Sequence, residues 1–196
     1  MSRRLVIAVD CDDVLIETTR FLVRDYNKKF DTHIALEDAH RPNNPDWGTD
    51  DSSLILDRLS EIQNTKEYAE IKPNTETIAA IHRLSKTNEL HLITARDCSV
   101  EVTTMAMLDR YFKGCFTSVE HVGRSRSKGE VCRQINADVL VDDDIRNLIS
   151  ALECGLPPDG AFHFGNYIWN RTDKLPNGVV RVLNWIEVEN YFHERS

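Results

Sequence analysis

The stretch LVIAVDCDDVL, residues 5–15, decides how the rest of the chain can fold. Its first five residues are apolar without a break, which is typical of a strand buried on both faces of a parallel sheet. Three carboxylates follow within four residues, those of Asp10, Asp12 and Asp13. Such close carboxylates stay ionised together only if a cation or strong donors hold them, and Mg²⁺ suits oxygen ligands. The stretch therefore predicts a buried strand that ends at a metal site.

The composition is that of a globular protein with one domain and a modest insertion. The 196 residues are 41% hydrophobic and 29% charged, so the chain can bury a sizeable core. The formal net charge of -8 disfavours a nucleic-acid backbone or an anionic membrane as the main partner. We therefore expect neither partner, and we interpret the acids gathered at strand ends as metal ligands.

Cysteine use and the amino-terminal region favour a cytoplasmic protein. The five cysteines are odd in number and form no CxxC pair, which favours free thiols in a reducing compartment. The first apolar run is too short for a signal peptide and meets aspartates at once. No apolar stretch approaches the length that spans a membrane. We expect a cytoplasmic location.

Short apolar runs alternate with segments of helical periodicity along the chain. The runs that predict strands are residues 5–9, 90–94, 116–122, 138–141, 161–164 and 179–182. The segments that predict helices are residues 17–30, 52–68, 75–86, 100–112, 128–135 and 145–154, with a last helix from residue 184. This alternation predicts an α/β fold, with a Rossmann-like, mostly parallel sheet and helices on both faces.

Residues 16–70 interrupt the alternation and predict a small helical cap inserted after the first strand. The remaining residues, 1–15 and 71–196, then form the core. Between two predicted helices lies HRPNNPDWGTDD, residues 40–51, whose composition is that of a loop. Trp47 in this loop either anchors local packing or contacts a substrate ring, and it is a candidate substrate-binding residue.

Further polar groups follow other predicted strands. Ligands of open parallel sheets bind beyond the carboxyl ends of the strands, where Thr94 and the run Asp142, Asp143 and Asp144 lie. The Thr94 hydroxyl and the next backbone N–H can hold an anion oxygen. Lys128 starts a helix, where the helix dipole disfavours a cation, so balancing carboxylates and a phosphate would explain it better than solvation alone. Helix capping explains single aspartates but not two clusters of three.

These groups together suit phosphoryl transfer. Mg²⁺ and Lys128 would neutralise the phosphate oxygens, where charge lies in the transition state. Asp10 would attack phosphorus and form an aspartyl-phosphate. Asp12 would protonate the leaving oxygen and then take a proton from the hydrolytic water. The expected substrate is a small phosphorylated metabolite.

Four segments resemble, in order, the four motifs of the haloacid dehalogenase (HAD) superfamily: DCDDVL, ITAR, SKGEV and VLVDDD. The resemblance implies that Asp10 is the nucleophile and Asp12 the general acid/base. It also implies that Mg²⁺ binds to Asp10, to the Asp12 carbonyl and to an acid of the fourth motif, either Asp142 or Asp143. A receiver-type signalling domain uses similar residues, but its lysine comes last, whereas Lys128 precedes the second acid cluster.

Within the superfamily, the chain looks nearest to the 5'(3')-deoxyribonucleotidase-like branch. The resemblance rests on DCDDVL near the start, a short cap, ITAR, and HFGNYIWNR before the last helix. It implies a nucleotide substrate, with Thr94, Ala95, Arg96 and Lys128 as candidate substrate-binding residues. Asp13 stands where that branch often has Gly. The alternatives are a phosphatase of another metabolite such as a sugar phosphate, and a HAD-like binding protein without turnover.

Overall fold

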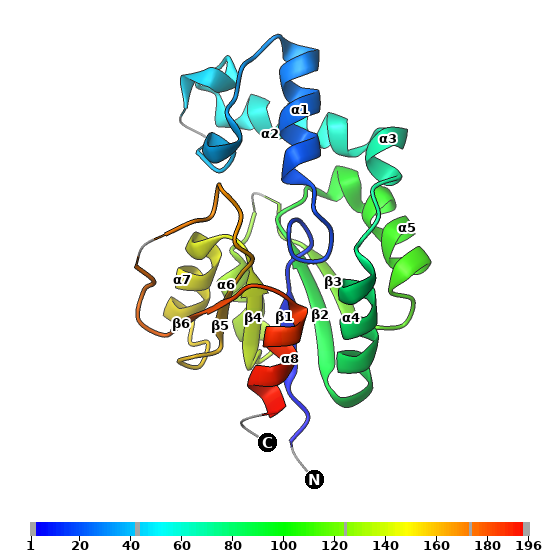
Figure 1. The fold of residues 1–196 in the computed structure, drawn as a ribbon, viewed down its shortest axis with the longest axis vertical. Coiled ribbons are helices and arrows are strands. Elements are labelled where there is room, and N and C mark those ends of the chain that lie inside the picture. The colour runs from blue at the N-terminus through cyan, green and yellow to red at the C-terminus, as the bar shows by residue number, and fades with distance from the viewer. Residues whose placement is uncertain (1–2, 42–43, 124, 173, 194–196) are drawn as a thin grey trace.

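Six parallel strands form the centre of the molecule (Figure 1). The computed structural model describes residues 3–41, 44–123, 125–172 and 174–193. The strands are β1 (Val6–Val9), β2 (Glu89–Thr94), β3 (Ser118–His121), β4 (Val139–Asp142), β5 (Ala161–Phe164) and β6 (Val179–Val182). Their order across the sheet is β3-β2-β1-β4-β5-β6, so β1 lies between β2 and β4. The predicted α/β fold is confirmed, and each of these strand pairs is parallel.

Helices cover both faces of the sheet, as predicted. The helices that pack on it are α4 (Thr75–Thr87), α5 (Glu101–Tyr111), α6 (Lys128–Gln134), α7 (Ile145–Glu153) and α8 (Trp185–His193). Buried side chains of α4, α5 and α8 belong to one apolar cluster, and those of α6 and α7 belong to another. Among the described residues, every helix is too short or too polar to span a bilayer.

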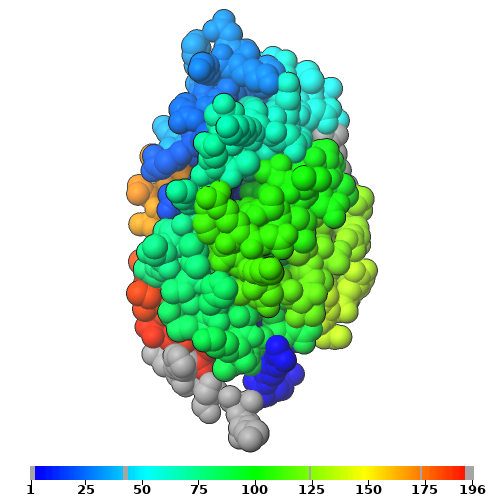
Figure 2. Space-filling view, turned by 90° about the vertical axis from the view of Figure 1, so that its right-hand side faces the viewer, coloured from blue at the N-terminus to red at the C-terminus, as the bar shows by residue number. Residues whose placement is uncertain are grey.

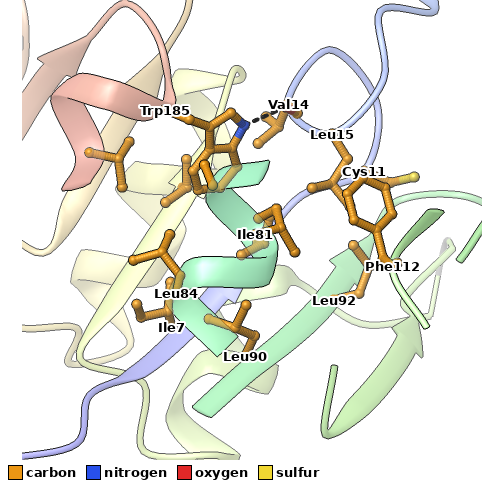
Figure 3. Close-up of a cluster of buried hydrophobic side chains, with 14 of the residues drawn as sticks. Ile7, Cys11, Val14, Leu15, Ile81, Leu84, Leu90, Leu92, Phe112 and Trp185 are labelled. Atoms are coloured by element: carbon orange, nitrogen blue, oxygen red, sulfur yellow. Dashed lines mark hydrogen bonds between the residues drawn. The ribbon is translucent and has the colours of Figure 1, made fainter. Parts of the chain in front are cut away.

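The apolar run of β1 explains why the sheet is buried on both sides. Ile7 and Val9 lie in the first cluster, whereas Ala8 between them lies in the second, because successive side chains of a strand point to opposite faces. Figure 3 shows the first cluster around α4, with Trp185 donating a hydrogen bond from Nε1 to the Val14 carbonyl at 3.1 Å. The loop after β1 is thereby fixed to the core.

Most element boundaries lie close to the predicted ones. The ranges of β5 and β6 are those predicted, and the other strands differ by one or two residues. The helix predicted over residues 52–68 is wrong as a single helix, because it divides into α2 (Ser52–Gln63) and α3 (Lys66–Ala69). The Thr65 hydroxyl accepts a hydrogen bond from the Tyr68 N–H at 3.3 Å and caps the second helix. The predicted loop, residues 40–51, carries the short 3₁₀ helix Pro45–Trp47, and a second one, Leu36–Asp38, precedes it.

The helical segment between β1 and α4, called the insert (residues 19–69), has its own apolar core. It contains α1 (Thr19–Phe30), α2 and α3. Its buried cluster consists of Val23, Tyr26, Ile34, Trp47, Ile55 and Ile62. Figures 1 and 2 show the insert at one end of the molecule, beyond the carboxyl ends of the strands. This is where the sequence predicts a cap.

Trp47 is part of the packing of the insert. Its surface is only 3% exposed, and its ring lies edge-on to Tyr26 with 4.9 Å between centroids. Its Nε1 donates to the Arg41 carbonyl at 3.1 Å, and the Tyr26 hydroxyl donates to the Trp47 carbonyl at 3.2 Å. These contacts support the packing anchor; Trp47 also lines the cavity between the sheet and the insert, and its contact with substrate stays a prediction.

We expect Trp47→Ala to lower the free energy of unfolding by about 3–5 kcal/mol, as for other buried large-to-small substitutions. Trp47→Phe, which keeps an aromatic ring against Tyr26, should lower it less. Chemical denaturation measures both effects, and limited proteolysis should cut the insert first in the alanine variant. Equal stability of Trp47→Ala and the unaltered protein would contradict the packing assignment.

Candidate active site

The polar groups of three strand ends meet on one side of a cavity between the sheet and the insert. The cavity has a volume of about 460 Å³. Residues of both acid clusters line it, together with Lys128. Carboxylate oxygens of Asp10, Asp142 and Asp143 lie within 4.8 Å of one another, although the first two are 132 positions apart in the sequence. The clusters predicted to meet at this edge therefore do meet.

Lys128 lies buried between the two acid clusters. Its Nζ is 2.6 Å from Asp10 Oδ1 and 2.7 Å from Asp142 Oδ2. Burial opposes its charge, but the two carboxylates outweigh burial and raise the pKa of Lys128. The helix that carries it begins with a capping box, in which the Ser127 hydroxyl accepts from the Glu130 N–H and the Glu130 carboxylate accepts from the Ser127 N–H. Ion pairing thus accounts for a lysine at this helix start.

The Asp10 carboxylate is held on one side. Oδ1 accepts from the Cys11 N–H at 2.7 Å and pairs with Lys128, and the described residues make no hydrogen bond to Oδ2. Burial raises the pKa of Asp10 to about 8, against the opposing charge of Lys128, and Asp142 adds to the rise. Asp10 lines the cavity. One oxygen atom of this carboxylate is therefore fixed and the other is available for chemistry.

Asp142 and Asp143 differ in their partners. Asp142 is fully buried; Oδ1 accepts from the Asp144 N–H at 2.9 Å and the Asn147 amide at 3.1 Å, and Oδ2 binds Lys128. Burial raises the pKa of Asp143 well above its usual range, with the charges of Asp13 and Asp10 adding to the rise. A bound cation would therefore stabilise the ionised form of Asp143, whereas the Asp142 carboxylate is already paired with Lys128.

Two weaker contacts surround Asp143. Its Oδ2 lies 3.4 Å from the Trp169 Nε1 and 4.0 Å from Nε2 of His40, a residue of the insert. The cluster contains three carboxylates, those of Asp10, Asp142 and Asp143, and one ammonium group, that of Lys128. Carboxylate oxygens are the ligands that Mg²⁺ prefers. The cluster of Asp10, Asp142 and Asp143 therefore fits a bound Mg²⁺.

Asp12 is held by a set of donors from both the core and the insert. Arg96 forms a two-point contact with its carboxylate, Nε to Oδ2 at 2.9 Å and Nη2 to Oδ1 at 2.8 Å. The hydroxyls of Thr18 and Tyr68 donate to Oδ1 at 2.7 and 2.8 Å. Burial alone would raise the pKa of Asp12, but Arg96 and these donors lower it to about 2. Asp12 is therefore ionised in this arrangement.

The residues of ITAR take different positions. Thr94 is fully buried, and its hydroxyl accepts from the Arg96 N–H at 3.2 Å. Ala95 is exposed and lines the cavity. The Arg96 guanidinium also donates to the Tyr68 hydroxyl at 2.7 Å and to the Thr104 hydroxyl at 3.0 Å. The structure thus gives this guanidinium protein partners, foremost Asp12, where the sequence predicts contact with substrate.

Asp13 fastens the insert to the loop after β1. Its carboxylate accepts from the backbone N–H groups of Thr18 and Thr19 at 2.9 and 3.2 Å, and from the Thr19 hydroxyl, at the start of α1. Its φ of 58° lies in the left-handed region, which Gly, Asn and Asp tolerate best. For this residue, the helix-capping explanation of a single aspartate holds.

Several residues of the site are absent from the sequence-based prediction. They are Thr18, His40, Tyr68, Thr104, Asn147 and Trp169. Tyr68 lies at the end of a predicted helix, where nothing in the local sequence indicates that its hydroxyl contacts Asp12. His40 lies in the polar loop, and only the fold brings it near Asp143.

Comparisons with known proteins support the fold. No protein-family model matches the chain, and neither does any curated protein. Among solved structures, a protein described as a predicted phosphatase from Clostridium acetobutylicum is 15% identical with a TM-score of 0.74, and the match covers 98% of this chain and 100% of that one. A haloacid dehalogenase-like family hydrolase from Streptococcus pneumoniae is 14% identical with a TM-score of 0.69, covering 96% and 98%.

A third solved structure, a HAD hydrolase from Bacillus subtilis described as bound to magnesium, is 10% identical with a TM-score of 0.63. The match covers 98% of this chain and 100% of that one. At such low identities, the similarities establish the fold. The chain has the fold of HAD-superfamily hydrolases, with a helical insert between β1 and β2.

The raised pKa values predict that Mg²⁺ binds more tightly as the pH rises. Because burial raises the pKa of Asp10 to about 8, a proton competes with the cation for this carboxylate near neutral pH. Affinity should rise by up to roughly tenfold per pH unit for each proton released, and level off above about pH 8. Calorimetric titrations from pH 6 to pH 9 measure this, with Asp143→Asn expected to bind more weakly. A constant affinity over this range would contradict the prediction.

Proposed function

We propose that this protein is a Mg²⁺-dependent phosphomonoester hydrolase that works through an aspartyl-phosphate on Asp10. One arrangement supports this activity above all. The Asp10 carboxylate lines the cavity with Oδ1 held by Lys128 and the Cys11 N–H, while Asp142 and Asp143 lie beside it. This arrangement provides a nucleophile, a fixed cation and a set of metal ligands at one point. Residues 1–15 and 71–196 would form the catalytic core, and residues 16–70 the cap.

Asp10, Asp143 and the Asp12 carbonyl would hold Mg²⁺, which when bound neutralises phosphate oxygens. Oδ2 of Asp10 would form a bond to phosphorus as the bond from phosphorus to the ester oxygen breaks. Lys128 keeps the nucleophile oriented and adds a positive charge next to the transferred group. Water would then attack phosphorus, release phosphate and restore the Asp10 carboxylate.

Asp12 would exchange protons in both steps. Ionised as it is here, it can take the proton of the hydrolytic water and thereby become the acid for the next leaving oxygen. A phosphate dianion beside it is a like charge, which raises the pKa of a carboxyl and favours the protonated form needed for donation. Arg96, Tyr68 and Thr18 would keep its carboxylate in position through both steps.

The activity is tested with a panel of phosphomonoesters, with and without Mg²⁺. The resemblance to the 5'(3')-deoxyribonucleotidase-like branch makes nucleoside 5'- and 3'-monophosphates the first candidates, followed by sugar phosphates and simple aryl and alkyl phosphates. We expect phosphate release that stops on chelation and resumes when Mg²⁺ is restored. Undiminished turnover after chelation would contradict the mechanism. Tight binding of phosphate compounds without turnover of any would favour the binding-protein alternative.

A further inference from the structure

The wall of the cavity opposite the carboxylates is one face of α2. The residues of α2 that line the cavity recur at helical spacing. They are Ser52, Ile55, Leu56, Leu59, Ser60 and Gln63. The middle of this face is aliphatic, and Leu22 and Val23 of α1 extend it. A substrate whose phosphate lies at Asp10 would therefore direct its organic part toward hydrocarbon side chains.

One aliphatic side chain of this wall is partly exposed. Leu56 is 43% exposed although it lines the cavity, so its apolar surface is available to a bound molecule. Covering such surface is favourable in proportion to its area. An aliphatic wall next to a charged site is the usual composition of a pocket that binds an apolar group and orients it by a few polar contacts.

The polar groups around the cavity are largely engaged with one another. Asp144 forms an ion pair with Arg146, and the Asn147 amide donates to the Asp142 carboxylate. The Trp47 ring is packed against Tyr26 and has little exposed surface for stacking. Sugar hydroxyl groups placed against Ile55, Leu56 and Leu59 would lose water without gaining hydrogen-bond partners from these three side chains. The polar residues of this face of α2 are Ser52, Ser60 and Gln63.

We propose that the insert selects phosphomonoesters whose leaving group is an apolar aryl or alkyl alcohol, through the wall of Leu22, Ile55, Leu56 and Leu59. This inference rests on the proposed phosphatase function and specifies its substrate class. Because the wall contacts the organic part and not the phosphate, it contributes to binding equally before and during reaction. It should therefore act mainly on KM.

The test uses n-alkyl phosphates of increasing length, phenyl phosphate, glucose 6-phosphate and thymidine 5'-monophosphate, all with Mg²⁺. Each methylene that the wall covers should raise kcat/KM by roughly fourfold. Leu56→Asn should lower kcat/KM for hexyl and phenyl phosphate by roughly tenfold, with little change for methyl phosphate. Leu54→Asn is the matched control, because Leu54 is 38% exposed on the same helix but is not among the residues that line the cavity.

A flat response to chain length, or a higher kcat/KM for the sugar phosphate or the nucleotide, would overturn the substrate class while leaving the phosphatase function intact. Calorimetric binding of hexylphosphonate and methylphosphonate, which cannot be hydrolysed, tests the wall independently of turnover. Tighter binding of hexylphosphonate that Leu56→Asn abolishes would support the inference even if no ester is cleaved. Equal binding of the two phosphonates would refute it.

Discussion

Asp10→Asn should reduce phosphate release by at least roughly 10³-fold while the protein stays folded. The amide has nearly the shape of the carboxylate but cannot attack phosphorus. Its loss of charge is tolerated, because the raised pKa of Asp10 shows that burial already disfavours the ionised form. Lys128 keeps the Asp142 carboxylate as a partner in the variant. Rates with and without the substitution, together with thermal unfolding, measure the two effects.

The role of nucleophile also requires a covalent intermediate on this residue. Brief reaction with substrate, acid quench and mass spectrometry should find a hydroxylamine-labile phosphate on Asp10, and none in Asp10→Asn. Asp109→Asn, at an exposed position of α5, is the matched control and should keep full activity. Full activity in Asp10→Asn, or a phosphate on another residue, would rule out the proposed mechanism.

Lys128→Met should strongly lower the stability of the protein. The ammonium lies between the carboxylates of Asp10 and Asp142, and its side chain is only 1% exposed. Removing one partner of a buried ion pair leaves uncompensated charge, which costs about 3–5 kcal/mol of unfolding free energy. The loss should increase with pH, because Asp10, whose pKa burial raises in the folded state, then loses the proton that would neutralise it.

Two rescue experiments distinguish the contribution of the Lys128 charge to stability from the contribution of its packing. Added Mg²⁺ should restore part of the stability of Lys128→Met, because the cation neutralises the same carboxylates. A second substitution, Asp142→Asn, should also restore part of it by removing one charge. Lys113→Met, at an exposed position after α5, is the control and should leave stability nearly unchanged. Failure of both rescues would mean that the side chain of Lys128 acts through packing alone.

The sequence was sufficient to predict the sheet and the gathering of the acids. Residues 161–164 (AFHF) and 179–182 (VVRV) are mostly apolar, and they predict β5 and β6 with their observed bounds. Because the carboxyl ends of parallel strands share one edge, Asp10 and Asp142 could be placed together without coordinates. This rule for parallel strands places the strand ends, but it does not predict which side chains form hydrogen bonds or ion pairs there.

The local sequence does not indicate which side chains pair at the site or how the helices of the insert are divided and packed. Arg96 contacts Asp12 across 84 positions of sequence, and no local pattern indicates that choice. Neither glycine nor proline marks the junction between α2 and α3, and the Thr65 cap separates the two helices. Trp47 in a polar loop was consistent with two roles, and its burial against Tyr26 depends on how the helices of the insert pack.

Two neighbouring aspartates, Asp12 and Asp13, hold the two ends of the insert by hydrogen bonds. The Asp13 carboxylate accepts from the N–H groups of Thr18 and Thr19 at the start of the first helix. The Asp12 carboxylate accepts from the Tyr68 hydroxyl in the last helix. A movement of the insert away from the core that is large enough to admit a bulky molecule would break the hydrogen bonds at one of these two ends. Releasing Tyr68 would take a hydrogen-bond donor away from the Asp12 carboxylate. In the proposed mechanism, movement of the insert and proton transfer by Asp12 would therefore be coupled through two adjacent residues.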